Sequence, residues 1–391
     1  MPPNSRINDN YLVEKATMLA TADECGLVAQ ALLEFDSSES FIFGWLAFPE
    51  SQHFYLDCQT RALLYAKPHI DVLQETLCAR EGKSPHCMAL RTAMGIPILL
   101  MGFAAYCRGE DPGVWESLAR RHFDYLMVKA PRSIKTAAIS SSEIDKWITA
   151  DSLFLILPFM AWCGLWFNDF NAVDDAVYTR RTYMKELQFD AGGLLVNYTC
   201  SRCHAPEGPP CGCLRRPTSI GNSLALAGMV RLLGTLLRTI QIATEDQENE
   251  AKPRAPSAEE IARETEVSDL LSDIRQILSV LTRGDVIDEE TGLIHSLLDD
   301  PTSPVDVAAS ALVAATIYNF FMLVSDWRAE SHGRILRANV HYDAVMKWVD
   351  DDANGRQTGE PNFLVYCCIL MMLGARRNPR LSEALEMSRS T

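Results

Sequence analysis

Apolar segments of two kinds alternate along this chain of 391 residues, and their alternation limits the folds available to it. Segments of the first kind are apolar on every side, so a helix formed by one of them must be covered all round. They occupy residues 94–107, 152–166, 223–236, 307–324 and 363–373. Segments of the second kind carry one apolar stripe opposite a charged face, which is typical of a helix that covers others. They occupy residues 114–130, 173–189, 266–283 and 334–350.

The segment at 266–283 shows such a stripe. Its apolar residues recur at intervals of three and four, the period of one helix face: Val267, Leu270, Leu271, Ile274, Ile277, Leu278 and Leu281. No stretch of the sequence shows convincing alternation of apolar and polar residues bounded by turn residues, the pattern of a strand. Buried helices alternating with covering helices are what a two-layer helical toroid requires, so we predict an all-α fold of the α/α-barrel type.

One charged segment interrupts the helical pattern. Residues 244–260 carry two prolines and no large apolar residue, so this segment cannot bury a face of its own. The helical pattern resumes unchanged after it. We therefore predict a flexible surface insertion at 244–260 inside a single domain that spans residues 1–391, and not a domain boundary.

The charge of the chain excludes two classes of partner. Its formal net charge is −15, and no basic stretch offsets this, so its field repels nucleic acid and anionic membrane surfaces. The uncharged run at 307–325 is about long enough to cross a bilayer, but Ser310, Thr316, Tyr318 and Asn319 interrupt it. We expect it to form a buried core helix, and we expect neither nucleic acid nor a membrane as a partner.

The first residues of the sequence predict where the protein is located. They show no basic stretch followed by an apolar one, so we expect no secretory signal and a cytoplasmic location.

Five metal-ligating side chains gather in the loop at 200–213, namely Cys200, Cys203, His204, Cys211 and Cys213. Their C-x-x-C-H and C-x-C spacings fit a tetrahedral zinc site. Free thiols in a mobile lid and redox-dependent disulfides are the alternatives.

Three stretches resemble the six-hairpin glycosidases of families 88 and 105, the unsaturated glycuronyl and rhamnogalacturonyl hydrolases. ADSLFLILPFMAWCG at 150–164 is similar to the family's Trp-x-Asp stretch and the apolar helix behind it. SIGNSLALAGMVRLLGTL at 219–236 is similar to the Gly-Asn-x-Trp helix start, and LLDDPTSPVDVAASALVAA at 297–315 to a Glu-x-Ser turn. Weaker similarity covers most of the chain and looks most like a divergent fungal branch. The resemblance implies an (α/α)6 barrel.

The resemblance also implies a catalytic residue. In the family a carboxylic acid protonates the double bond of an unsaturated uronic acid and water adds to the neighbouring carbon, which is general acid–base chemistry. Asp151 falls on the family's catalytic aspartate. Asp151 also stands at the start of an uncharged helix, where aspartate is a favoured N-cap, so a purely structural role is the alternative.

Several other positions depart from the family's pattern. The tryptophan two residues before the aspartate becomes Thr149, with Trp147 two residues too early, and the tryptophan of Gly-Asn-x-Trp becomes Leu224. A family histidine falls near Asn197, a second acid falls on Leu90, and the glutamate of the third stretch is matched by Asp306 at best. Aromatic platforms stack on sugars and polar groups satisfy their hydroxyls, so these changes favour a less polar ligand.

Two further polar residues could each contact a ligand or cap a helix. These are Asn222 and Asp306, which both stand before apolar runs. We favour the N-cap for both.

These observations suggest an enzyme redirected from sugar hydrolysis. We expect a tailoring step (hydration, isomerisation or cyclisation) on a small, fairly apolar substrate in a fungal secondary-metabolite pathway. Asp151 would be its proton donor, and no cofactor would be required. Fold alone does not give function, so two alternatives stay open. They are an unsaturated glycuronyl hydrolase acting on an unsaturated uronic-acid disaccharide, and a non-catalytic binding protein.

Overall fold

The apolar segments form the inner layer of a ring of helices. The computed structural model describes residues 9–21, 24–36, 61–73, 92–133, 135–140, 146–189, 193–199, 215–248, 258–324, 328–354, 362–378, 381 and 385, to which all structural statements refer. The inner helices are α2 (Cys25–Asp36), α5 (Gly95–Cys107), α7 (Ser152–Leu155) with α8 (Leu157–Trp166), α10 (Ser219–Glu248), α12 (Val307–Leu323) and α14 (Phe363–Arg377). Each packs on the next, and α14 packs on α2, which closes the ring.

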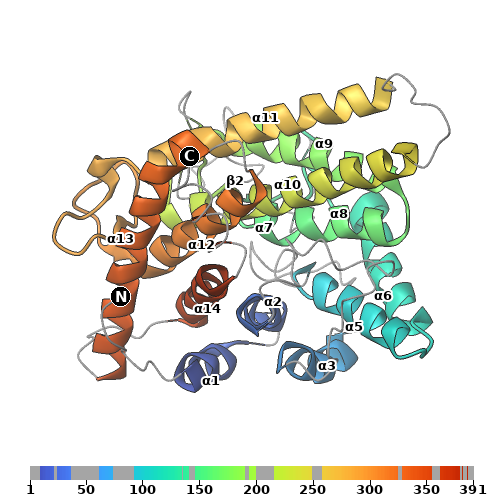
Figure 1. Ribbon diagram of the computed structural model, residues 1–391, viewed down its shortest axis with the longest axis horizontal. Helices are drawn as coiled ribbons and strands as arrows, with labels where there is room; N and C mark the ends of the chain where they lie inside the picture. Colours follow the sequence, from blue (N-terminus) through green and yellow to red (C-terminus); the bar gives the residue numbers. More distant parts are fainter. Residues whose placement is uncertain are drawn as a thin grey trace.

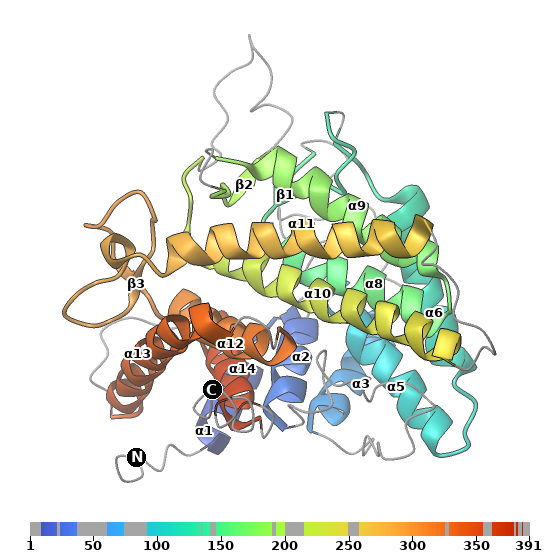
Figure 2. The same cartoon turned by 45° about the horizontal axis from the view of Figure 1, so that its top comes forward.

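A second set of helices covers this ring. The outer helices are α1 (Asp9–Leu19), α3 (Arg61–Leu73), α6 (Gly113–Asp124), α9 (Phe170–Leu187), α11 (Ala258–Leu281) and α13 (Arg328–Ala353). In that order they pack on α14, α2, α5, α8, α10 and α12. Figure 1 shows α2 and α14 end-on above α1 and α3, with α10 and α11 side by side across the top. Figure 2 shows α10 and α11 side by side across the middle of the view. The predicted all-α barrel is confirmed.

The few strands are two-residue pairs in the connections. β1 (Ile148–Thr149) pairs antiparallel with β2 (Tyr198–Thr199), with Thr149 opposite Tyr198. β3 (Ile294–His295) pairs antiparallel with β4 (Val305–Asp306), with Ile294 opposite Asp306. Both pairs directly precede inner helices, so they fix where α7 and α12 begin.

Two segments differ from the sequence-based expectation. The apolar run at 152–166 is not one helix, because α7 ends at Leu155 and α8 starts anew at Leu157 with Pro158 in its first turn. Proline fits a first turn but lacks the donor for a helix interior. The predicted insertion at 244–260 is helical at both ends, since α10 continues to Glu248 and α11 begins at Ala258. Its glutamates and alanines favour a helix even where little apolar area is buried; residues 249–257 lie outside the described residues.

Among the described residues, one helix has the length and hydropathy of a membrane span. It is the part of α10 from Ser219 to Gln241, and 83% of its apolar window is buried inside the protein. Its apolar faces are covered by α7, α8, α11 and α12. We therefore interpret it as a core helix of the ring, and α12, from the apolar run at 307–325, is buried in the same way.

Glycines let the inner helices approach one another closely. A Cβ atom added to Gly374 of α14 would lie 2.1 Å from the backbone oxygen of Glu34 in α2, and one added to Gly228 of α10 would lie 2.0 Å from that of Leu153 in α7. Because these neighbours are backbone atoms, no side chain can rotate away to make room. Both contacts therefore require glycine.

We expect Gly374→Ala to destabilise the ring where α14 meets α2. Overpacking of this kind costs about 1–3 kcal/mol, and the backbone contact places this case at the upper end. Denaturant unfolding would measure the change. Gly333→Ala in the outer helix α13 is the matched control, since nothing lies within 4 Å of the added atom there. It should be neutral or stabilising by about 0.5–1 kcal/mol; equal effects at both sites would contradict the close-approach interpretation.

Two buried histidines make folding sensitive to acid. Burial lowers the pKa of His122 to about 4, and burial also lowers the pKa of His341 to about 4. Nε2 of His122 lies 3.2 Å from Oγ1 of Thr92, and Nδ1 of His341 lies 2.9 Å from the backbone oxygen of Gly292. Both rings are therefore neutral in the folded protein at neutral pH, whereas in the unfolded chain they bind a proton near pH 6.5.

The free energy of unfolding should therefore fall as the pH is lowered from 6.5 to 4. In this window the unfolded chain binds more protons than the folded one, and the loss approaches about 3 kcal/mol for each histidine. Urea unfolding at pH 7 and pH 5 would measure it. His122→Phe should show a smaller loss between the two pH values than the wild type, because the carboxylates titrate alike in both proteins. An identical loss would show that His122 does not titrate as expected.

Candidate functional site

Trp147 and Thr149, which precede Asp151, lie beside Asn197 from the connection before α10. The backbone N–H of Ala150 donates to the backbone oxygen of Asn197 at 2.9 Å, next to the β1–β2 pair. The hydroxyls of Thr149 and Ser152 lie 2.8 Å apart, and Thr149 is buried. Trp147 is half-buried just before β1. The structure thus brings Trp147, Thr149 and Asn197 to one connection, directly ahead of Asp151.

Asp151 occupies the N-cap position of α7 but its side chain makes no capping hydrogen bond to that helix. Its backbone oxygen accepts the N–H groups of Phe154 at 3.0 Å and Leu155 at 2.9 Å, while the residue is 8% exposed. Burial raises the pKa of the Tyr183 phenol, and the charge of Asp151 acts in the same direction. Because the side chain of Asp151 makes no capping hydrogen bond, it does not serve as a helix cap, which was the structural alternative.

Asn222 positions the loop before β2. Its Nδ2 donates to the backbone oxygens of Leu195 and Thr218, both at 2.9 Å, and its Oδ1 accepts the N–H of Leu195 at 3.0 Å. The residue is fully buried. The favoured N-cap interpretation is wrong, because α10 begins at Ser219, three residues earlier. Both amide protons of Asn222 are bonded to backbone oxygens, which leaves no donor for a ligand, and a contact of this residue with a ligand stays a prediction.

Asp306 is the predicted cap of α12. Its carboxylate accepts the backbone N–H of Ala309 at 2.9 Å and the hydroxyl of Ser219 at 3.0 Å. Burial raises the pKa of Asp306, and these two hydrogen bonds oppose the rise. The carboxylate therefore joins the first turn of α12 to that of α10.

Backbone contacts extend this junction. Thr218 bridges to Leu297, and the N–H of Ser219 donates to the backbone oxygen of Ser296 at 3.0 Å. Together with the Asn222 and Asp306 bonds, they link the starts of α7, α10 and α12 at one end of the ring. The three stretches that resemble the glycosidases therefore meet in space.

The predicted metal ligands cannot be placed. Cys200, Cys203, His204, Cys211 and Cys213 all lie outside the described residues. Within the part of the chain that the structure describes, no group of three or more His, Cys, Asp or Glu side chains could hold a metal ion. The choice between zinc, thiols and disulfides in the loop at 200–213 stays a prediction.

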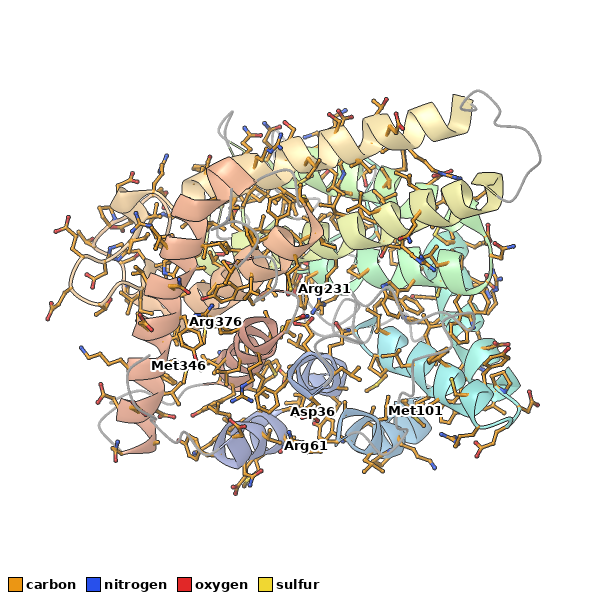
Figure 3. The ribbon with its side chains drawn as sticks, viewed as in Figure 1. Asp36, Arg61, Met101, Arg231, Met346 and Arg376 are labelled. Carbon is orange, nitrogen blue, oxygen red and sulfur yellow. The ribbon has the colours of Figure 1, made fainter. Side chains whose placement is uncertain are left out.

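The sequence reasoning missed a buried charged cluster at the centre of the ring. Arg231 of α10 is 2% exposed, forms an ion pair with Glu34 of α2 and donates to Oε1 of Gln30 at 2.8 Å. Its guanidinium carbon lies 3.8 Å from the centre of the Phe154 ring. Burial raises the pKa of Glu34 and lowers that of Arg231, and each charge opposes the shift of the other. Figure 3 places Arg231 between α10 and α2.

This cluster had a signal in the sequence. Arg231 is the one charged residue in the otherwise apolar run at 223–236, and Gln30 and Glu34 recur four residues apart in the apolar run that forms α2. Residues four apart share a helix face. A charged residue in a helix that must be covered on every side requires a buried partner.

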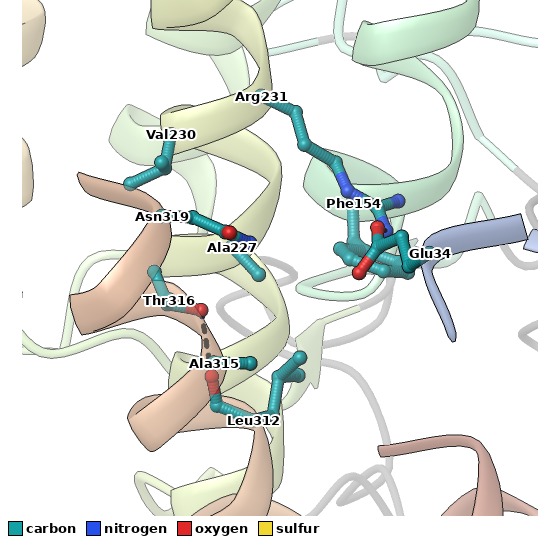
Figure 4. Close-up of a pocket in the computed structure, with 9 residues that line it drawn as sticks. All are labelled: Glu34, Phe154, Ala227, Val230, Arg231, Leu312, Ala315, Thr316 and Asn319. Carbon is teal, nitrogen blue, oxygen red and sulfur yellow. Dashed lines mark hydrogen bonds and ion pairs between the residues drawn. The ribbon is translucent and has the colours of Figure 1, made fainter. Parts of the chain in front are cut away.

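A small pocket lies beside this cluster. Its enclosed space has room for about one water molecule. Figure 4 shows its lining residues, Glu34, Phe154, Ala227, Val230, Arg231, Leu312, Ala315, Thr316 and Asn319. Pockets that enclose a drug-sized ligand measure roughly 300–1,000 Å³, so this one is too small for an organic ligand as the structure stands.

Comparison with known proteins agrees with this architecture. Neither the models of protein families nor the curated proteins give a match. A possible member of glycoside hydrolase family 105 from Klebsiella pneumoniae superposes with a TM-score of 0.64 at 12% identity, over 98% of this chain and 96% of that one. An unsaturated glucuronyl hydrolase specific for heparin gives 0.59 at 12% identity, over 97% and 96%. The fold is that of the six-hairpin glycosidases.

A third solved structure is also similar to this chain. The unsaturated glucuronyl hydrolase responsible for glycosaminoglycan degradation in Bacillus sp. GL1 gives a TM-score of 0.53 at 15% identity, over 93% of this chain and 96% of that one. At such identities the likeness concerns the scaffold, since one fold carries many chemistries. The scaffold is glycosidase-like, and the predicted fold class is confirmed.

We expect Arg231→Met to destabilise the protein by about 3–5 kcal/mol, because it leaves the Glu34 carboxylate buried without its partner. Arg231→Met combined with Glu34→Gln should cost less, since no buried charge is left alone. Denaturant unfolding would measure both. Arg283→Met, which breaks the exposed 3.0 Å pair with Asp285, is the control and should cost less than about 1 kcal/mol. A double variant as unstable as the single one would show that the unpaired charge of Glu34 does not cause the loss of stability.

Proposed function

We propose that the protein is a glycosidase-like enzyme redirected to a tailoring step on a small, mostly apolar molecule. The step is a proton-transfer-assisted hydration, isomerisation or cyclisation, and Asp151 supplies the proton. The observation that carries the proposal is the state of Asp151: a carboxylate at the start of an inner helix, mostly buried, that does not cap the helix. A buried carboxyl group in the interior of a barrel is a candidate acid or base.

The surroundings of Asp151 support an apolar substrate. Thr149 and Leu224 stand where the sugar-handling tryptophans of the resembling family would be, and both are buried. Thr149 is bonded to Ser152 and therefore offers a ligand little. Apolar walls with few polar groups select ligands by shape and by a small number of hydrogen bonds.

The chemistry needs only proton movements. The protonated Asp151 carboxyl adds its proton to one carbon of a carbon–carbon double bond, which leaves a cation at the other carbon. Water, an internal nucleophile or loss of a neighbouring proton then gives hydration, cyclisation or isomerisation, and Asp151 must regain its proton before the next turnover. No electron is transferred, so the proposal requires no redox cofactor. A structural zinc ion at 200–213 would be compatible with it.

The cellular setting is part of the proposal. On the resemblance to a fungal branch, we propose a cytoplasmic enzyme of secondary metabolism. The partner it requires is a small-molecule substrate, and the charge of −15 argues against nucleic acid.

Metabolite profiling of the native host with this chain deleted tests the proposal. A precursor should accumulate in the deletion strain and be removed by wild-type complementation, whereas Asp151→Asn should leave at least 90% of it in place. Asp285→Asn, an exposed aspartate, is the matched control and should complement fully. Complementation by Asp151→Asn at the wild-type level would overturn the catalytic role of Asp151.

Two alternative functions predict other outcomes. The fold likeness favours an unsaturated glycuronyl hydrolase, which would abolish the ultraviolet absorbance of the double bond in unsaturated disaccharides. We expect no such activity, because Thr149 and Leu224 replace the aromatic platforms of the resembling family. A non-catalytic binding protein would retain its biological output in both Asp151→Asn and Asp151→Ala.

A further inference from the structure

The buried carboxylate of Glu34 receives few hydrogen bonds. Within the part of the chain that the structure describes, its one donor is the guanidinium of Arg231, which bonds to Oε1. An ionised carboxylate only accepts, and its two oxygens together have about four acceptor sites. A buried ion pair is tolerated when further hydrogen bonds satisfy the remaining lone pairs. Oε2 of Glu34, which is on a residue only 6% exposed, therefore requires a donor of its own.

A donor lies on the other side of the pocket beside this ion pair. Asn319 of α12 is half-buried, and its amide makes no hydrogen bond to any of the described residues. Figure 4 shows it on the α12 side of the pocket, across from Arg231 and Glu34. The amide nitrogen can donate two hydrogen bonds. A group between Asn319 and Glu34 could thus accept from the first and donate to the second.

Thr316 adds another acceptor to the pocket. Its hydroxyl donates to the backbone oxygen of Leu312 at 2.7 Å, one turn earlier in α12. A hydroxyl has one proton and two lone pairs, so Oγ1 can only accept on its pocket side. Thr316 is 2% exposed, so a donor to this oxygen must lie inside the pocket.

The size of the pocket limits what can make these contacts. Its enclosed space has room for about one water molecule. The remaining lining residues besides Arg231 are apolar, namely Phe154, Ala227, Val230, Leu312 and Ala315. Water has two protons and two lone pairs, and a buried water molecule makes about three hydrogen bonds to protein groups. The pocket offers three such groups, of which two accept and one donates.

We propose that this pocket is a binding site for one structural water molecule. The water donates one proton to Oε2 of Glu34 and the other to Oγ1 of Thr316, and it accepts an N–H of the Asn319 amide. It thereby links α12 to the ion pair between α10 and α2 and completes the hydrogen bonding of the buried carboxylate. This binding requires no catalytic role for Asp151.

A crystal structure of the full-length protein, at a resolution that shows ordered water, tests the proposal. One peak of water density should lie in the pocket. Its centre should be about 2.7–3.2 Å from Nδ2 of Asn319 and about 2.5–3.0 Å from both Oε2 of Glu34 and Oγ1 of Thr316.

Two variants remove the site in different ways. Asn319→Leu removes the donor, whereas Ala315→Val fills the space and leaves all three polar partners in place. The water peak should be lost in both variants. Asn354→Leu, the same substitution on the exposed end of α13, is the matched control and should keep the water.

A solution measurement is independent of crystals. Relaxation dispersion of water oxygen-17 counts the water molecules that stay bound for longer than the protein takes to tumble. The count should fall by about one in Asn319→Leu and in Ala315→Val, and it should stay unchanged in Asn354→Leu. Circular dichroism and the unfolding transition identify the folded variants, and if Asn319→Leu does not fold, Ala315→Val alone provides the comparison.

Several results would overturn the proposal. They are a wild-type pocket without a water peak, a peak out of hydrogen-bond reach of Glu34 or Asn319, and a water peak that persists in a folded Ala315→Val protein. An equal count of long-lived water molecules in the wild type and in the folded variants would do the same.

Discussion

The ion pair between Arg231 and Glu34 holds the centre of this molecule. It joins α10 to α2 across the ring, and the same guanidinium contacts Phe154 of α7 and bonds to Gln30. Two charges this deeply buried are tolerated only because each neutralises the other and because neighbouring groups complete their hydrogen bonds. Gln30 in turn donates to the backbone oxygen of Ala93 at 2.6 Å, which extends the cluster to the segment leading into α5. Three helices and the segment before α5 thus share one polar contact point inside an apolar ring.

The candidate site depends on a second, backbone-based junction. Asn222, Asp306 and Ser219 tie the starts of α10 and α12 to the connections before them, and the β1–β2 pair does the same for α7. All of these bonds are made within the chain itself, so they fix the shape of this end of the ring and the position of Asp151 with it.

Much of the fold could be predicted because the inner and outer helices have different apolar patterns. The all-apolar runs became α5, α8, α10, α12 and α14, and the striped segment at 266–283 became part of α11. Less of the site could be predicted. Asp306 caps α12 as favoured, whereas Asn222 lies inside α10 and bonds to Leu195, a residue 27 positions earlier. A polar residue before an apolar run looks like a cap in sequence, and only the position of a distant loop shows that its amide is used elsewhere.

The sequence by itself determined the helical class, the division into buried and covering helices, and the place of Asp151 at the start of an inner helix. These follow from periodicity and composition, which are local properties. The tertiary structure alone decided that Arg231 meets Glu34, 197 positions away, and that Asn319 faces a pocket beside them. It also decided that the side chain of Asp151 does not cap its helix. The contact between Arg231 and Glu34 joins two helices that are far apart in the chain, so no local property of the sequence shows it.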